Sequence, residues 1–248
     1  MGKVEDYRNQ LHKLYVADWD AFLLAESGLP GPRGNIELAR AVAMEGDAAC
    51  FDRYLAIDAS QAPVNTPGEF LAFCGVLGLG GLVAAGERPL SALKVPANDA
   101  RWRTREAVAM ALQSVGRADM EQLVALRGWA EGSYLEQRAA AAGLCEPDLL
   151  TTSQACLLVL DILDIVTGTI ADAENRKDEA FRALRKGMAY CWSVAVAACP
   201  EQGKERFERW LASEDKDVRW IMGENLKKKR LLRLDEVWVE RCRRELED

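Results

Sequence analysis

Two acidic residues in this sequence have a spacing that could support chemistry. Asp161 and Asp164 lie three residues apart in an otherwise apolar stretch, so on a helix their carboxylates share one face. Two neighbouring carboxylates can act as an acid/base pair when their surroundings split their pKa values. A narrow polar stripe facing solvent explains the same spacing, and we favour it because charged residues mostly lie at surfaces. The pair alone does not establish an enzyme.

A second group combines tryptophan with arginine at the starts of two expected helices. Its members are Arg101, Trp102, Arg103, Arg105, Arg219 and Trp220. Tryptophan offers a large apolar contact area, and arginine offers planar donors to carboxylates or phosphates. These residues are therefore candidates for a binding face. The alternative is that Trp102 and Trp220 fill the core, and the sequence weighs the two interpretations equally. For Trp129 and Trp192 the core interpretation is favoured.

The sequence offers few metal ligands or activated nucleophiles. His12 is the only histidine, and the seven cysteines contain no C-x-x-C pair. A zinc site needs three or four ligands at workable spacing, so we predict no metal site, no cofactor and no catalytic residue of the histidine-dependent kind. The scattered cysteines with apolar neighbours predict free, buried, unreactive thiols, and with the charged N-terminus they favour a cytoplasmic protein.

Composition narrows the class of partner. The 248 residues are 49% hydrophobic and carry 32 basic against 39 acidic side chains, a formal charge of −7. A chain of this kind can bury a continuous core. Because nucleic-acid and membrane-surface binders need a basic footprint, the acidic balance disfavours both.

Two apolar runs resemble membrane spans in composition. The run Phe70–Ala85 is sixteen residues long and contains four glycines, and the run Ala155–Ala171 is interrupted by two aspartates. The first is shorter than the roughly 20 residues that cross a bilayer, and we expect both to be buried helices without a membrane. The glycines lack the strand and the lysine of a phosphate-binding loop, so they predict close helix packing.

The remaining periodicity is helical. Val108, Ala111, Leu112 and Val115 have the i, i+3, i+4, i+7 spacing of one helix face. Prolines fall between such segments or at their first turns, where a helix tolerates them. Sustained β-branched alternation and hairpin dipeptides are absent from the sequence. The sequence therefore predicts an all-α fold.

The helices show an internal repeat. Arg105, Arg138, Arg185 and Arg219 each enter a helix rich in small residues, at separations of 33, 47 and 34. An aspartate before such a helix, as in Asp215-Lys216-Asp217-Val218-Arg219, caps its N-terminus, and the arginine can bridge neighbouring repeats. On these residues the chain resembles the HEAT-repeat family, including bacterial members of unassigned role. The resemblance implies an α-α superhelix, or α-solenoid, of antiparallel helix pairs.

We expect a single solenoid domain over residues 1–248. Residues 1–95 form degenerate helical repeats, 98–230 the clearer ones, and 231–248 a C-terminal capping helix. The resemblance implies a non-enzymatic scaffold that holds a protein or peptide on its concave face. The alternative is a HEAT-like alkylpurine DNA glycosylase or another nucleic-acid-binding repair protein. Those glycosylases pair aromatic rings with a carboxylate, which Trp102 with Glu106, or Trp220 with Asp217 or Glu224, would imitate.

Overall fold

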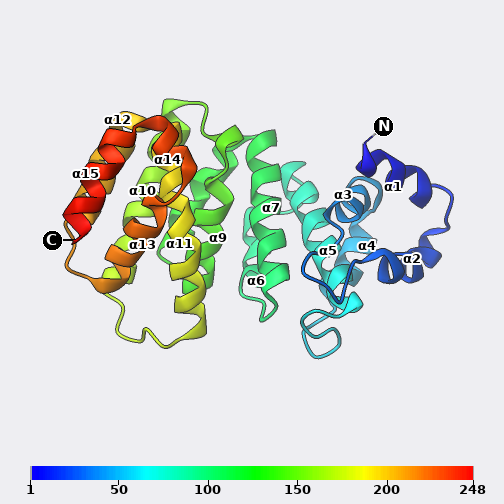
Figure 1. Ribbon diagram of the computed structural model, residues 1–248. Helices are drawn as coiled ribbons and strands as arrows, with labels where there is room; N and C mark the ends of the chain where they lie inside the picture. The colour runs from blue at the N-terminus through cyan, green and yellow to red at the C-terminus, as the bar shows by residue number, and fades with distance from the viewer. Residues whose placement is uncertain (1, 248) are drawn as a thin grey trace. The chain divides into compact units, whose positions relative to one another are not determined.

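The computed structural model describes residues 2–247, and within that range the fold is all-α, as the sequence predicts (Figure 1). The described residues form fifteen α-helices and four short 3-10 helices, without a strand. They divide into two compact units, residues 1–119 and 120–248. This division falls inside the region that the sequence assigns to the clearer repeats.

Unit 1 is built around one long helix. Its elements are α1 (Lys3–Leu11), η1 (Val16–Asp18), α2 (Trp19–Glu26), α3 (Ile36–Glu45), α4 (Ala48–Leu55), α5 (Pro67–Ala84), η2 (Leu90–Leu93), α6 (Lys94–Ala97) and α7 (Trp102–Ala118). Helix α5 packs against α2, α3, α4 and α7, while α1 packs on α3. Because neighbours surround it, α5 is apolar on all sides rather than amphipathic.

The glycines of α5 allow its neighbours to approach closely. A Cβ atom on Gly80 would lie 2.5 Å from the Cβ of Ala111 in α7, and one on Gly78 would overlap the ring of Phe51 in α4. These distances are shorter than real Cβ contacts, so only glycine fits at the two positions. The prediction that this glycine cluster serves helix packing is confirmed.

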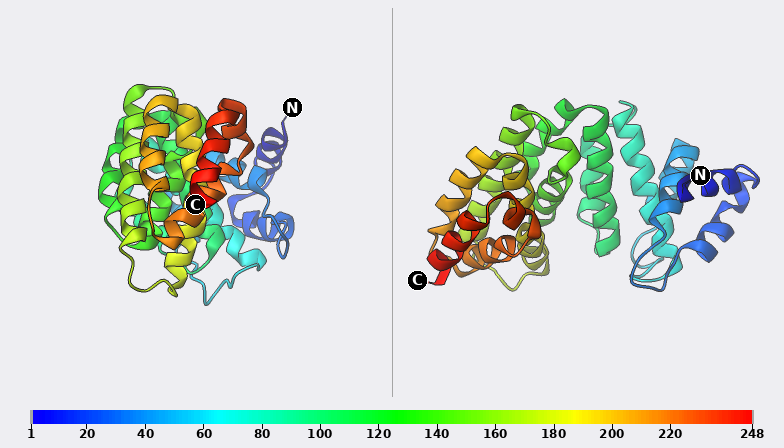
Figure 2. Two further views of the ribbon diagram at one scale, coloured as in Figure 1. Left: turned by 60° about the vertical axis from the view of Figure 1, so that its left-hand side comes forward. Right: turned by 45° about the horizontal axis from the view of Figure 1, so that its top comes forward.

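Unit 2 has its helices in two layers. Its elements are η3 (Met120–Leu126), α8 (Arg127–Ala130), α9 (Tyr134–Leu144), η4 (Pro147–Leu149), α10 (Ser153–Ala171), α11 (Glu179–Ala198), α12 (Pro200–Leu211), α13 (Lys216–Leu226), α14 (Lys229–Leu234) and α15 (Glu236–Glu247). Helices α9, α11 and α13 pack side by side, and α8, α10 and α12 form a second row against them. Both rows can be followed by colour from green to orange in Figure 2.

Aromatic rings fill the core of unit 2. Trp129 and Trp192 are both buried, as the sequence favoured. The indole nitrogen of Trp192 donates to Thr167 Oγ1 at 3.0 Å, so the buried polar atom is satisfied. The ring of Phe207 packs edge-on against both Trp192 and Trp238. These rings join α11, α12 and α15 into one core, and the hydrogen bond to Thr167 adds α10.

The expectation of seven free thiols is wrong for two cysteines. Cys156, in the first turn of α10, and Cys199, which precedes α12, form a disulfide across a Cα–Cα distance of 5.9 Å. Their separation of 43 residues gave no sign of this pairing, because the packing of the helices brings them together. One argument for a cytoplasmic location thereby falls away, since disulfides are rare in cytosolic proteins.

The other five cysteines are free and buried, as predicted. Burial raises the pKa of the Cys242 thiol to about 12 and also raises the pKa values of Cys74 and Cys145. Thiols with raised pKa values carry little thiolate near neutral pH and therefore react slowly.

Two helices, α5 and α10, have the length and apolar character of a membrane span. In their most apolar windows, 72% of the residues of α5 and 56% of those of α10 are buried inside the protein. Neighbouring helices thus cover most of the apolar surface of α5, as in a core helix.

Candidate functional site

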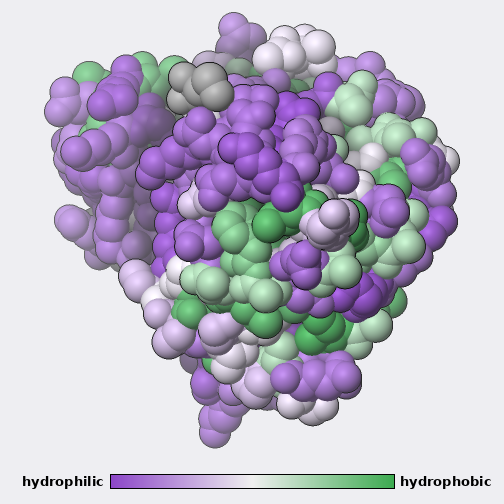
Figure 3. Space-filling view, turned by 90° about the vertical axis from the view of Figure 1, so that its right-hand side faces the viewer, coloured by the Kyte–Doolittle hydropathy of each residue, from purple (hydrophilic) through white to green (hydrophobic). Residues whose placement is uncertain are grey.

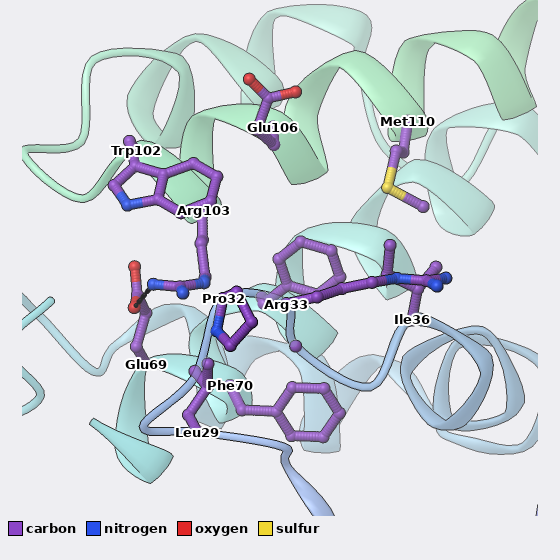
Figure 4. Close-up of a pocket in the computed structure, with 12 residues that line it drawn as sticks. Leu29, Pro32, Arg33, Ile36, Glu69, Phe70, Trp102, Arg103, Glu106 and Met110 are labelled. Atoms are coloured by element: carbon purple, nitrogen blue, oxygen red, sulfur yellow. Dashed lines mark hydrogen bonds and ion pairs between the residues drawn. The ribbon is translucent and has the colours of Figure 1, made fainter. Parts of the chain in front are cut away.

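A pocket in unit 1 is a candidate site. Three segments line it: the loop and first turn between α2 and α3, the N-terminal half of α5, and one face of α7. The lining residues are Leu29, Pro32, Arg33, Gly34, Ile36, Glu69, Phe70, Phe73, Trp102, Arg103, Glu106 and Met110. In Figure 4, Trp102, Arg103 and Met110 of α7 face the side chains of the other two segments across a common space, whereas the Glu106 carboxylate points away from it. Most of the wall is apolar or aromatic.

The size of the pocket limits what it can hold. Its cavity volume is about 230 Å³, below the roughly 300–1,000 Å³ of sites for drug-sized ligands. The space therefore suits one large side chain or a small molecule rather than a nucleotide cofactor.

A buried ion pair forms one corner of the pocket. Arg103 of α7 donates from Nη1 to Glu69 Oε2 at 3.1 Å. Its Nη2 donates to the carbonyl of Gly31 at 2.6 Å and to Asn65 Oδ1 at 3.2 Å. Glu69 Oε2 also accepts from the backbone N–H of Asn65 at 2.7 Å. The arginine thus ties α7 to the loop that precedes α3 and to the turn that precedes α5.

Two polar atoms in this corner are left without partners. Glu69 is 0% exposed, and its Oε1 has no hydrogen-bond partner among the described residues. The same holds for Nε of Arg103. Buried polar groups in folded proteins nearly always have partners, so an unpaired carboxylate oxygen marks this corner as unusual.

Trp102 lies at the rim of the pocket. Its side chain is 45% exposed, and the guanidinium of Arg103 stacks on its ring at 4.4 Å from the centroid. In Figure 4 the Glu69 side chain points toward Arg103 and Trp102 from the opposite side of the pocket. Arg33, also at the rim, pairs with Glu37 at 3.0 Å. The rim therefore combines an exposed indole with an exposed charged side chain.

The neighbouring arginines from the sequence analysis have internal partners. Arg101 is 2% exposed, and its guanidinium pairs with Asp99 at 2.7 Å and donates to the carbonyl of Ile57 at 2.8 Å. Arg105 donates to the carbonyls of Asp99 and Ala100. Arg101 and Arg103 are therefore buried residues that hold loops together, and of this group only Trp102 is well exposed. Both arginines are drawn inward, where they satisfy backbone carbonyls, and Arg103 also lines the pocket. Their role on a binding face stays a prediction.

Arg219 and Trp220 lie in unit 2, on α13. Both are half-buried. Arg219 donates to the carbonyl of Leu246 near the end of α15, and the guanidinium of Arg185 stacks on the Trp220 ring at 3.6 Å from the centroid. Arg185 also pairs with Asp217 through Nε at 2.7 Å. That Arg219 and Trp220 share one binding face with Trp102 stays a prediction.

Asp161 and Asp164 form the centre of an ion-pair network in unit 2. Arg206 of α12 donates to both carboxylates, at 2.7 and 2.8 Å. Arg127 donates to the second oxygen of Asp161 at 2.7 Å, and Trp210 Nε1 donates to the second oxygen of Asp164 at 2.7 Å. Every carboxylate oxygen of the pair is therefore occupied.

The electrostatics of this network oppose acid/base chemistry. Desolvation by burial raises the pKa of Asp161, but the hydrogen bonds and charges of Arg206 and Arg127 outweigh it, and the pKa is lowered overall. A carboxylate with a lowered pKa stays ionised near neutral pH and cannot donate a proton there. The two side chains are half-buried rather than part of an open solvent stripe.

Sequence reasoning missed most of the pocket. Glu69 was not singled out, and Phe70 and Phe73 belong to an apolar run that looks like ordinary core. The one local signal was the loop Gly28-Leu29-Pro30-Gly31-Pro32-Arg33-Gly34, whose composition indicates an irregular turn. Gly28 adopts a φ of 73° there. No group of three or more potential metal ligands occurs in residues 2–247.

Comparison with family models, with curated proteins and with solved structures finds no match to this chain.

Proposed function

We propose that this protein is an interaction module that binds a segment of another protein, and that the pocket of unit 1 receives a large apolar side chain of that partner. The observation that carries the proposal is the apolar pocket with an exposed tryptophan at its rim. Partly exposed tryptophans beside apolar pockets are typical anchors of protein interfaces. Figure 3, which looks onto unit 1, shows an apolar area bordered by hydrophilic surface, and such areas often mark contact sites.

The mutual pairing of the charged groups also favours binding over catalysis. Arg103 and Glu69 pair with each other, and the carboxylates of Asp161 and Asp164 are held by arginine and indole donors. Groups engaged in this way stabilise the fold. We therefore propose a non-enzymatic role.

We further propose that the chain is a HEAT-like α-solenoid. In unit 2, the pairs α8/α9, α10/α11 and α12/α13 follow one another, and the second helix of each pair packs beside the next. Arg185 of α11 pairs with Asp217 of α13, and Asp215 accepts hydrogen bonds from the backbone N–H groups of Asp217 and Val218 at the start of α13. These contacts support the repeat role that the sequence assigned to the aspartates and arginines.

Selection of peptides from a random display library on the immobilised full-length protein tests the binding role. We expect the selected peptides to share a large apolar residue and to lose binding to Trp102→Ala. Met44→Ala is the matched control, because Met44 is an exposed apolar residue of unit 1 outside the pocket. Failure to select any peptide, or equal binding by wild type and Trp102→Ala, would contradict the proposal.

One observation favours a second candidate, the alkylpurine DNA glycosylase. Trp102 and Glu106 line the same pocket, and an aromatic ring beside a carboxylate suits a cationic base. Release of methylated purines from alkylated duplex DNA by the wild-type protein, abolished in Glu106→Gln, would support this candidate. Absence of release under conditions where a known glycosylase is active would remove it.

A further inference from the structure

The unpaired oxygen of Glu69 distinguishes this pocket from a plain apolar one. Oε2 of the carboxylate accepts two hydrogen bonds, from Arg103 and from the Asn65 backbone, whereas Oε1 accepts none from the described residues and is shielded from water. Leaving a buried charged acceptor unpaired costs free energy. A bound group that donates a hydrogen bond to Oε1 would recover that free energy, and a purely apolar group would not.

The walls around this oxygen indicate what carries the donor. The rings of Phe70, Phe73 and Trp102 and the thioether of Met110 line the pocket, and aromatic rings pack well against such groups. The volume of about 230 Å³ has room for one large side chain. An aromatic side chain with an N–H donor on its ring meets both requirements.

We propose that Glu69 is a specificity-determining residue, and that the occupant of the pocket is a tryptophan side chain of the partner whose indole N–H donates to Glu69 Oε1. This inference rests on the proposed function, because it names the partner residue for the same pocket. Oε1 is shielded from solvent in this structure, so the indole reaches it through a shift of the rim. The two residues at the rim, Trp102 and Arg33, are 45% and 64% exposed.

The charge balance agrees with a neutral donor. The negative charge of Glu69 is already matched by Arg103 at 3.1 Å, so a cationic occupant would place a second positive charge beside the guanidinium. An indole N–H adds a donor without adding charge. Hydrogen bonds to charged groups are about twice as strong as those between neutral groups, so the effect on selectivity is large.

Titration of the full-length protein with small probes tests the inference without changing the fold. The probes are N-acetyl-tryptophanamide, its 1-methylindole analogue, which lacks the N–H, and N-acetyl-phenylalaninamide. NMR signals of the Met110 methyl group and the Trp102 indole N–H report occupancy of the pocket, and the Met44 methyl group serves as a control outside it. We expect the tryptophan probe to bind at least about tenfold more tightly than the other two, the usual effect of one hydrogen bond to a charged group.

A variant provides the matched protein-side test. Glu69→Gln keeps the size of the side chain but removes its charge, and we expect it to reduce the preference for the N–H probe over its methylated analogue at least about threefold. If this variant does not fold, the comparison of the three probes on wild type still decides the question.

The outcomes separate the inference from the proposed function. Equal binding of all three probes would overturn the role of Glu69 while leaving an apolar peptide pocket intact. Tighter binding of the phenylalanine probe would do the same. If no probe shifts the Met110 and Trp102 signals up to its solubility limit, both the inference and the pocket's role in peptide binding are overturned.

Discussion

The two acidic sites of this protein are built in opposite ways. In unit 2, Asp161 and Asp164 are half-buried, and arginine or indole donors occupy all four of their carboxylate oxygens. In unit 1, Glu69 is fully buried, yet one of its oxygens has no partner among the described residues. A network in which every carboxylate oxygen accepts a hydrogen bond holds helices together. A buried oxygen without a partner instead leaves an acceptor that a bound donor can satisfy. The comparison teaches that the aspartate pair, the more conspicuous acidic motif in the sequence, holds the structure together.

The same contrast applies to the two tryptophans that follow arginines. Trp102 is 45% exposed at the edge of a pocket, while Trp220 is half-buried and covered by the Arg185 guanidinium. Similar local sequences thus give a pocket rim in one unit and an interhelical contact in the other. The difference lies in the neighbouring segments: α11 supplies Arg185, which covers Trp220, whereas the segments around Trp102 form a pocket and leave the ring exposed.

The largest effect is expected when the partner of Glu69 is removed. Arg103→Met leaves a buried carboxylate without its counter-charge, and we expect the free energy of unfolding to fall by about 3–5 kcal/mol. Urea denaturation followed by circular dichroism measures this change. Arg206→Met is the matched control in unit 2. We expect it to cost about 1 kcal/mol, because Arg127, Arg209 and Trp210 still contact the aspartates. Equal losses in the two variants would erase the distinction between the sites.

Removal of the disulfide tests how much this bond stabilises unit 2, which contains the aspartate network. Cys156 and Cys199 tie the start of α10, which carries the aspartates, to the start of α12, which carries Arg206. Replacing both cysteines by alanine should lower the free energy of unfolding by about 2–4 kcal/mol, as expected for a loop of this length. Denaturation with and without a reducing agent provides the measurement. The reducing agent should destabilise the wild type and leave the stability of the double variant unchanged. A wild type whose stability does not change on reduction would contradict the pairing of Cys156 with Cys199.

The pH dependence of unit 2 sharpens the comparison further. The pKa of Asp161 is lowered in the folded protein, so its carboxylate stabilises the fold above its unfolded pKa, about 3.9. That contribution is lost as the pH falls through the lower, folded pKa. We expect Asp161→Asn to cost about 1 kcal/mol at pH 7 and less at pH 3. A cost that grows on acidification would show that the sign of the pKa shift is wrong.

The smallest effect on stability is expected at the rim of the pocket. Trp102→Ala removes an exposed ring and its contact with Arg103, and we expect the free energy of unfolding to fall by less than about 1 kcal/mol. Peptide binding should be lost in the same variant. Thermal melts of Trp102→Ala and Trp220→Ala give the comparison, and the half-buried Trp220 should show the larger drop. A cost of about 3–5 kcal/mol at Trp102, the range for a buried aromatic, would make it a core residue.

Some features of this protein were determined by the sequence alone. The i, i+3, i+4, i+7 spacing of Val108, Ala111, Leu112 and Val115 predicted α7, and all four residues are buried on it. Helical periodicity is local, so it can be read without knowing what the helix packs against. Asp215 was expected to cap a helix, and it accepts hydrogen bonds from the first N–H groups of α13 for the same local reason.

Only the tertiary structure decided which polar side chains are buried and which partners they have. The sequence placed Arg101 and Arg103 beside Trp102 without showing that backbone carbonyls and Glu69, contributed by distant loops and helices, draw both arginines inward. It also gave no sign that Cys156 would meet Cys199, or that Glu69 would face Phe70, Trp102 and Met110 around one cavity. Burial and hydrogen-bond partners depend on contacts between segments far apart in the chain. Residue type and spacing fix the helices, and the packing between those helices sets the chemistry of each side chain.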